Sequence, residues 1–125
     1  MSTPILKQGH YLIASLQPEQ SDTDLLQLQD ILVEQVGRFR SRGLILDVTL
    51  LDVMDSFATR TLRNIAQAVS LRGAETVIVG IRPEIAFAMV QLGLDARLSG
   101  VRTALDLEEA LAILNRRCQE GMCRD

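Results

Sequence analysis

The chain of 125 residues is poor in the residue types that many binding and catalytic sites use. It has no tryptophan, one histidine and two cysteines, and aromatic residues make up only 3% of it. So low an aromatic content argues against a base-stacking platform for nucleic acid. The net charge of −3 argues against general binding to nucleic acid or to an acidic membrane surface. Because aromatic residues are so few, the core must be built from aliphatic side chains.

Long hydrophobic segments are also missing from the sequence. No stretch approaches the roughly 18 consecutive apolar residues that a membrane-spanning helix needs. Residues 1–9 lack the basic and apolar regions of a signal peptide, so we expect a cytoplasmic protein. Cys118 and Cys123 match no metal-binding spacing, and we expect both to be reduced thiols.

The motifs of common enzymes and cofactor sites are absent as well. Gly80 precedes a helical segment without the further glycines of a phosphate-binding loop. No histidine, cysteine and carboxylate residues have metal-ligand spacing, so we expect no metal and no other cofactor. A small hydrolase that uses Ser56, His10 and Asp47 remains the least favoured alternative, because Ser56 lacks the flanking glycines of a nucleophile elbow. We expect a protein that is not an enzyme.

What the sequence does contain is an alternation of strand-like and helix-like segments. The apolar residues at 5–6 and 11–16 predict an edge hairpin around Gln8-Gly9. Short apolar runs predict strands at 44–47, 76–80 and 101–104, and helical spacing predicts helices at about 23–40, 55–72, 83–92 and from 107 onward. We expect one α/β domain over residues 1–125, a mixed sheet with about four helices in the order β-β-α-β-α-β-α-β-α, with parallel right-handed crossovers and a frayed tail at about 119–125.

Caps are recognisable at several of the predicted helix starts. Ser21 or Asp22 suits the start of the first helix, and Pro83 suits the first turn of the third. Asp106 and Glu109 have the spacing of a capping box at the last helix. The expected packing residues of that last helix are Leu107, Leu111 and Leu114.

Residues 44–69 join a buried strand to a helix that begins near Asp55 and Ser56. A helix start gathers unpaired N–H groups and the positive end of the helix dipole, so it favours a negative group. Helical spacing puts one set of residues on a buried face: Ala58, Leu62, Ile65, Ala66 and Val69. The opposite stripe is Ser56, Arg60, Arg63 and Gln67. Spacing alone leaves two interpretations open, a capping serine above a solvated basic face or a docking face with a serine that is phosphorylated.

These residues resemble a known family. A strand that ends in Asp47, a loop and the pair Asp55-Ser56 at a helix start resemble the phosphorylation segment of STAS domains, the family of anti-sigma-factor antagonists and sulfate-transporter tails. The order of elements matches that fold over about residues 5–117. The run V-G-I-R-P-E-I-A at 79–86 resembles the stressosome branch, the RsbR and RsbS proteins of bacteria. A lone domain with serine rather than threonine at position 56 favours the RsbS type.

The resemblance implies a non-catalytic scaffold and phosphoacceptor in a bacterial stress-signalling complex. Proteins of this type co-assemble with RsbR-like sensor paralogues and hold an RsbT-like serine kinase, which is released when the serine is phosphorylated. A partner phosphatase resets the site. The resemblance leaves one alternative within the same fold, a stand-alone anti-sigma-factor antagonist that binds an anti-sigma kinase.

Carried over to this sequence, Ser56 is the phosphoacceptor and Asp55 is the acidic residue before it. Arg60, Arg63 and Thr59 form the surroundings of the site or the partner face, and Thr49 is a weaker second candidate for phosphorylation. A phosphate adds a charge of roughly −1.5 to −2 at neutral pH. At a helix start that charge is tolerated by the fold, so we expect it to change what docks there.

Overall fold

The computed structural model describes residues 4–18, 20–51, 55–82 and 101–117. The strands are β1 (Ile5–Gln8), β2 (Tyr11–Ser15), β3 (Gly43–Asp47), β4 (Glu75–Val79) and β5 (Val101–Ala104). The helices of these ranges are α1 (Asp22–Phe39), α2 (Ser56–Ser70) and α5 (Leu107–Arg117). The elements at these positions agree with the sequence to within one or two residues. The predicted helix at 83–92, the two cysteines and the tail lie outside the described residues.

The five strands form one sheet in the order β1-β2-β3-β4-β5. β1 is antiparallel to β2, and the other neighbouring pairs are parallel. The central strand β3 pairs with both neighbours, so that Leu46 lies opposite Ala14 on one side and Ile78 on the other. The prediction of a mixed sheet with an edge hairpin is confirmed.

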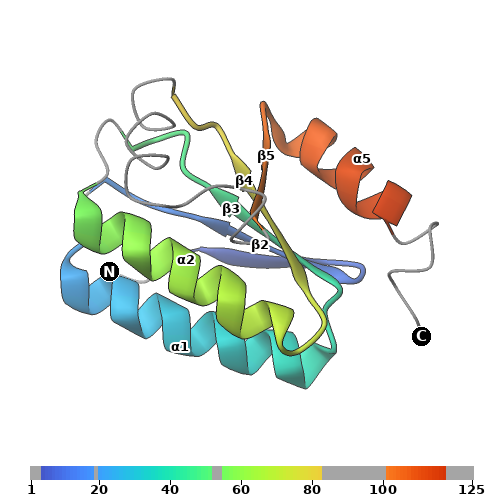
Figure 1. Ribbon diagram of the computed structural model, residues 1–125, viewed down its shortest axis with the longest axis horizontal. Helices are drawn as coiled ribbons and strands as arrows, with labels where there is room; N and C mark the ends of the chain where they lie inside the picture. The colour runs from blue at the N-terminus through green and yellow to red at the C-terminus, as the bar shows by residue number, and fades with distance from the viewer. Residues whose placement is uncertain (1–3, 19, 52–54, 83–100, 118–125) are drawn as a thin grey trace.

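Helices α1 and α2 lie side by side on one face of the sheet, and α5 lies on the other face (Figure 1). Alternation along the strands supplies a core for each face. In β3, Leu44 and Leu46 belong to the core under α1 and α2, whereas Ile45 belongs to the core under α5. Because both faces are covered, the central strands carry apolar residues on both faces, as expected for parallel strands.

The predicted apolar face of α2 is confirmed, since all five of its residues are buried in the core with α1. Near the far end of the helix pair, the guanidinium of Arg72 lies against Gly37 of α1. A Cβ at position 37 would overlap it. Glycine at this position therefore lets the arginine lie across α1.

The packing of α5 differs in part from the prediction. Ala110 and Leu114 are buried against the sheet, and Leu111 is partly buried. Leu107, however, is 40% exposed, so its predicted place in the packing face is wrong. Residues 110 and 114 are one helical turn apart and define the inward stripe, and Leu107 lies in the first turn. Asp106 caps this helix as predicted, because its Oδ1 accepts a hydrogen bond from the Glu109 N–H at 2.9 Å.

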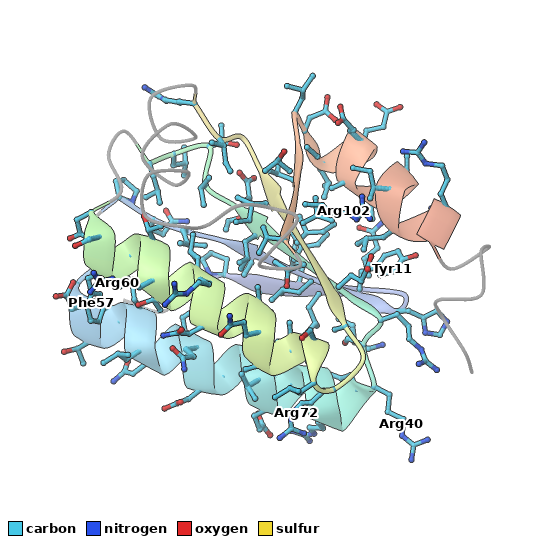
Figure 2. The ribbon with its side chains drawn as sticks, viewed as in Figure 1. Tyr11, Arg40, Phe57, Arg60, Arg72 and Arg102 are labelled. Atoms are coloured by element: carbon cyan, nitrogen blue, oxygen red, sulfur yellow. The ribbon has the colours of Figure 1, made fainter. Side chains whose placement is uncertain are left out.

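Tyr11 ties β2 to α5. Its hydroxyl donates a hydrogen bond to Asn115 Oδ1 at 2.6 Å, and Figure 2 shows its ring on the α5 side of the sheet. Burial raises the pKa of the Tyr11 hydroxyl. The buried ring and the hydrogen bond to Asn115 thus link β2 to the covering helix α5.

Candidate functional site

The candidate site lies at the carboxyl edge of the parallel strands. β2, β3 and β4 run in the same direction, so their carboxyl ends meet at one edge of the sheet. The starts of α1 and α2 lie at this edge too, because each helix follows one of these strands (Figure 1). In open α/β sheets, this edge is where functional residues gather.

A compact junction follows β3. Asp47 Oδ1 accepts hydrogen bonds from the backbone N–H of Thr49 at 2.9 Å and from its hydroxyl at 2.5 Å. Gly80, just after β4, has a φ of +82°, and a Cβ there would overlap the side chain and backbone of Thr49. Glycine at position 80 thus allows both the left-handed backbone and the close approach of the two loops.

The start of α2 is capped by Asp55. This residue has extended backbone angles of φ −77° and ψ 175°, and its Oδ1 accepts a hydrogen bond from the Ala58 N–H at 2.7 Å. Its carbonyl oxygen accepts from both the N–H and the hydroxyl of Thr59, each at 3.0 Å. The capping role that the sequence left open for Ser56 is therefore taken by its neighbour.

Ser56 is the first residue of α2, and its side chain is exposed. Within the part of the chain that the structure describes, its hydroxyl makes no hydrogen bond. Arg60 and Gln67 are exposed on the same stripe, and Arg63 is half-buried. Figure 2 shows Phe57 and Arg60 at this end of α2, opposite the end that carries Arg72. The outward stripe predicted from spacing is thus present, with its serine free of the cap.

Two residues near the serine, Thr59 and Arg63, are more buried than a residue of an exposed partner face. Thr59 was expected on or beside the partner face, but it is only 1% exposed. It therefore belongs to the surroundings of Ser56 and not to the exposed face. Thr59, Leu62 and Ala66 follow the spacing of a buried stripe, which is the signal that identifies its position. The Nε of Arg63 is buried and has no hydrogen-bond partner among the described residues.

The structure does not assemble the hydrolase triad. The carbonyl of His10 accepts a hydrogen bond from the Arg42 N–H at 2.7 Å, so His10 lies beside the beginning of β3. Asp47 lies at the end of this five-residue strand. Four residue steps of about 3.3 Å separate the two ends by ~13 Å. His10 and the Asp47–Ser56 edge are therefore at opposite ends of the sheet.

A hollow of about 190 Å³ lies between the starts of α1 and α2. The residues that line it come from the end of β2, the turn before α1, both helices and the loop after β3: Leu16, Gln17, Pro18, Gln20, Asp22, Leu25, Leu51, Asp55 and Ala58. Among residues 4–18, 20–51, 55–82 and 101–117, no group of three or more metal-ligating side chains comes together. None of the helices in those ranges is long and apolar enough to cross a membrane.

A family model for the STAS domain matches residues 7–110. The chain belongs to the STAS domain family. This STAS domain is 38% identical over 80 residues to the RsbT co-antagonist protein RsbRD of Bacillus subtilis (strain 168), a match that covers 64% of the chain and 28% of that relative. It is 31% identical over 90 residues to the RsbT co-antagonist protein RsbRA of the same organism, and this match covers 66% of the chain and 33% of that relative. The chain therefore spans about a third of the length of these relatives.

Two solved structures cover the domain almost completely. A serine-to-glutamate variant of RsbS from Moorella thermoacetica has a TM-score of 0.84 and 32% identity, covering 94% of this STAS domain and 97% of that chain. A chain in a structure of the stressosome, described as a signal integration and transduction hub, has a TM-score of 0.79 and 33% identity. The match covers 93% of this STAS domain and 99% of that chain. The resemblance to the stressosome branch that the sequence indicated is confirmed.

Proposed function

We propose that this STAS domain is a non-catalytic scaffold and phosphoacceptor of a bacterial stressosome. It holds a switch kinase and releases it when Ser56 is phosphorylated. The observation that carries the proposal is that Ser56 is exposed at the start of α2 and that the helix cap does not use its hydroxyl. A kinase that reaches this hydroxyl breaks no hydrogen bond between residues that the structure describes.

The surroundings of Ser56 suit a phosphate without a change of fold. The first turn of a helix has N–H groups that lack intrahelical partners, and the helix dipole there favours a negative charge by about 0.3–1 kcal/mol. Arg60 lies one turn further along and is exposed, so it offers a countercharge. Asp55 opposes the added charge, but it is exposed and the repulsion is screened by water.

The same phosphate changes the docking properties of this face. It adds a charge of roughly −1.5 to −2 next to Asp55. A partner that packs on the unmodified serine and the nearby Arg60 then meets concentrated negative charge in place of a neutral hydroxyl. Juxtaposed like charges at an interface cost several kcal/mol, so the phosphorylated face releases its partner.

Ser56 suits phosphorylation better than the two neighbouring threonines. The hydroxyl of Thr59 is buried and donates to the Asp55 carbonyl oxygen. The hydroxyl of Thr49 donates to the Asp47 carboxylate, and the residue packs against Gly80. A phosphate on Thr49 would place two negative groups together and separate the loops. Thr49 therefore stays a second and weaker candidate site.

We infer the partners of this domain from its relatives. RsbRD and RsbRA are described as co-antagonists of RsbT, so we assign this domain a serine kinase of the RsbT type as its captured partner. We further propose that the domain co-assembles with RsbR-like sensor paralogues in the cytoplasm. A partner phosphatase then removes the phosphate and resets the site. Size separates this function from the alternative. A large co-assembly with a paralogue supports the scaffold, and a small complex with an anti-sigma kinase supports a stand-alone antagonist.

The direct test is to locate the phosphate. The domain is incubated with its cognate RsbT-type kinase and ATP, and phosphopeptides are mapped by mass spectrometry. We expect one phosphate on Ser56, its loss in Ser56→Ala, and unchanged incorporation in the matched variant Thr49→Ala. Phosphate on another residue, with Ser56 unmodified, would overturn the mechanism.

A further inference from the structure

One end of the molecule carries a surface of exposed cations, which we call the basic pole. Helices α1 and α2 both end there, and strands β3 and β4 begin there. Its exposed cations are Lys7, Arg38, Arg40 and Arg72. Within the described ranges, no carboxylate forms an ion pair with any of these four side chains. The basic pole is therefore not neutralised by salt bridges of its own.

The cations of the basic pole come from three elements and meet at the last turn of α1. The Nζ of Lys7 and the guanidinium of Arg38 each lie 5.6 Å from the centre of the Phe39 ring. The guanidinium of Arg72 lies against Gly37, and the Arg40 N–H donates a hydrogen bond to the Gly37 carbonyl oxygen at 3.4 Å. Figure 2 shows Arg40 and Arg72 at this end of the helix pair.

The basic pole keeps a positive charge when its neighbours are counted. Arg42 and Glu75 lie side by side, since the Glu75 N–H donates to the Arg42 carbonyl oxygen at 3.1 Å, and their charges cancel. Glu34, one turn before Arg38, offsets one of the four cations. The carboxyl ends of α1 and α2 contribute about half a negative charge each, so a charge of about +2 remains. The whole chain has a net charge of −3, so the rest of it is strongly acidic.

Large apolar side chains are exposed among these cations. Leu71, just after α2, is 89% exposed and is the most exposed large hydrophobic residue of the described ranges. Phe39 is 41% exposed. Exposed apolar groups beside unpaired cations are typical of a surface that binds a partner. Such a partner must be acidic and must offer apolar side chains of its own.

The start of α5 carries a surface of that complementary kind. The run L-D-L-E-E at residues 105–109, which we call the acidic patch, is exposed without a break. Leu105 is 82% exposed, second only to Leu71 among the large hydrophobic residues of the described ranges. Of the three carboxylates in the run, the nearby Arg102 offsets one. The acidic patch follows the carboxyl end of β5, so it lies at the opposite end of the sheet from the basic pole.

We propose that the basic pole binds the acidic patch of a second copy of this chain, head to tail. Leu71 and Phe39 pack against the two leucines of residues 105–109, and the cations face its carboxylates. Such a contact leaves one basic pole and one acidic patch free at the ends of a pair, so further copies add to form rings or chains.

This contact is separate from the Ser56 face. The acidic patch lies with α5 on one face of the sheet, and Ser56 lies with α2 on the other face (Figure 1). A second copy bound through α5 therefore leaves the serine open to a kinase. The proposal rests on charge and exposure alone and not on phosphorylation.

Self-association can be measured directly on the full chain. Sedimentation velocity is recorded over a series of protein concentrations, at low and at high salt. We expect the sedimentation coefficient to rise with concentration at low salt. At high salt it should approach the value of the monomer, because exposed charges are screened.

Charge reversal on each surface makes the test specific. Arg38→Glu/Arg40→Glu turns the basic pole acidic, and Glu108→Arg/Glu109→Arg turns the acidic patch basic. Each variant alone brings like charges together, so each dissociation constant should rise at least about tenfold. An equimolar mixture of the two variants should associate again, because contacts between unlike variants pair opposite charges.

The control is Arg116→Glu, which reverses an exposed arginine outside both surfaces. It should self-associate like the wild type. Circular dichroism checks the fold of every variant. If the variant of the basic pole unfolds, Leu71→Asp takes its place, since it puts a negative charge at the most exposed apolar position.

A chain that stays a monomer at every concentration would overturn the proposal, even if its basic pole bound an acidic protein of another kind. Self-association that neither salt nor charge reversal changes would overturn it as well. Either result would leave phosphorylation of Ser56 untouched. Conversely, an unmodified Ser56 after kinase treatment would contradict the proposed function and not the head-to-tail contact.

Discussion

The starts of α1 and α2 use the same two residue types in opposite order. At α1 the order is Ser21-Asp22, and the serine is the cap. Its hydroxyl accepts a hydrogen bond from the Asp24 N–H at 3.1 Å, and Asp24 accepts one from the Ser21 N–H at 3.1 Å. At α2 the order is Asp55-Ser56, and the aspartate is the cap. Exchanging two neighbours therefore decides whether a serine hydroxyl holds a helix together or stays available to a partner.

The two helix starts also differ in how completely their capping groups are paired. The α1 start is a reciprocal capping box, in which both partners are satisfied within the helix. The α2 start has a single cap, followed by a hydroxyl and an arginine that are exposed. Both helices pack on the same face of the sheet (Figure 1), so the difference lies in these few residues and not in the surrounding architecture.

The largest effect should come from exchanging the order at α2. The double variant Asp55→Ser/Ser56→Asp gives α2 the order found at α1, so the serine becomes the cap and its hydroxyl is occupied. We expect the fold to remain, because serine and aspartate are equally good caps. Phosphate incorporation by the cognate kinase should fall at least about tenfold, which corresponds to ~1.4 kcal/mol. Incorporation at the wild-type rate, measured with labelled ATP, would show that neither the capping role of the serine nor a carboxylate at position 56 controls access.

A smaller effect should appear in the free energy of unfolding of single variants. Ser21→Ala and Asp55→Ala each remove a cap, and each should cost about 1 kcal/mol. Ser56→Ala removes a hydroxyl that the cap does not use, and its effect should stay within about 0.5 kcal/mol. Urea denaturation of the three variants beside the wild type measures these differences. A cost for Ser56→Ala equal to that of Asp55→Ala would contradict the assignment of the cap.

The smallest effect should be a pH dependence specific to α1. The hydrogen bond from the Ser21 backbone N–H lowers the pKa of the Asp24 carboxyl, with a further contribution from the Ser21 side chain. The unfolded chain therefore binds a proton at Asp24 first, near its ordinary pKa of about 3.9. The stability that this carboxylate provides is present above that pH and is lost as the pH falls through the lower, folded pKa.

Asp24→Asn lacks this titration. We expect the wild type to be more stable than Asp24→Asn at neutral pH, and the difference to shrink as the pH falls below about 4. Denaturation series at several pH values follow the difference. If the difference in the free energy of unfolding between the two proteins were the same at pH 7 and near pH 3, the α1 capping box would not depend on the charge of Asp24.

Much of this architecture could be predicted from the sequence, because apolar spacing is a strong local signal. The strands and the buried face of α2 follow from it directly. The cap of α2 remained open, since aspartate and serine both cap well and a helix boundary is uncertain by a residue. Leu107 was misplaced because an apolar residue in a first helical turn can satisfy the spacing and still lie outside the inward stripe that Ala110 and Leu114 define.

The hollow could not be predicted at all. Its lining comes from the end of β2, the start of α1, the loop after β3 and the start of α2. These segments are spread over residues 16–58 of the sequence. They meet only because parallel crossovers bring two helix starts to one edge of the sheet. No local pattern in the sequence carries that information.

The central claim is that a phosphate on Ser56 changes docking and leaves the fold intact. The most direct measurement compares the affinity of the cognate RsbT-type kinase for the domain with and without a stoichiometric phosphate on Ser56, together with the circular dichroism of both forms. The account predicts an affinity at least about tenfold weaker for the phosphorylated form, or ~1.4 kcal/mol, with superimposable spectra. Equal affinities, or a phosphorylated domain that has lost its helical signal, would contradict it.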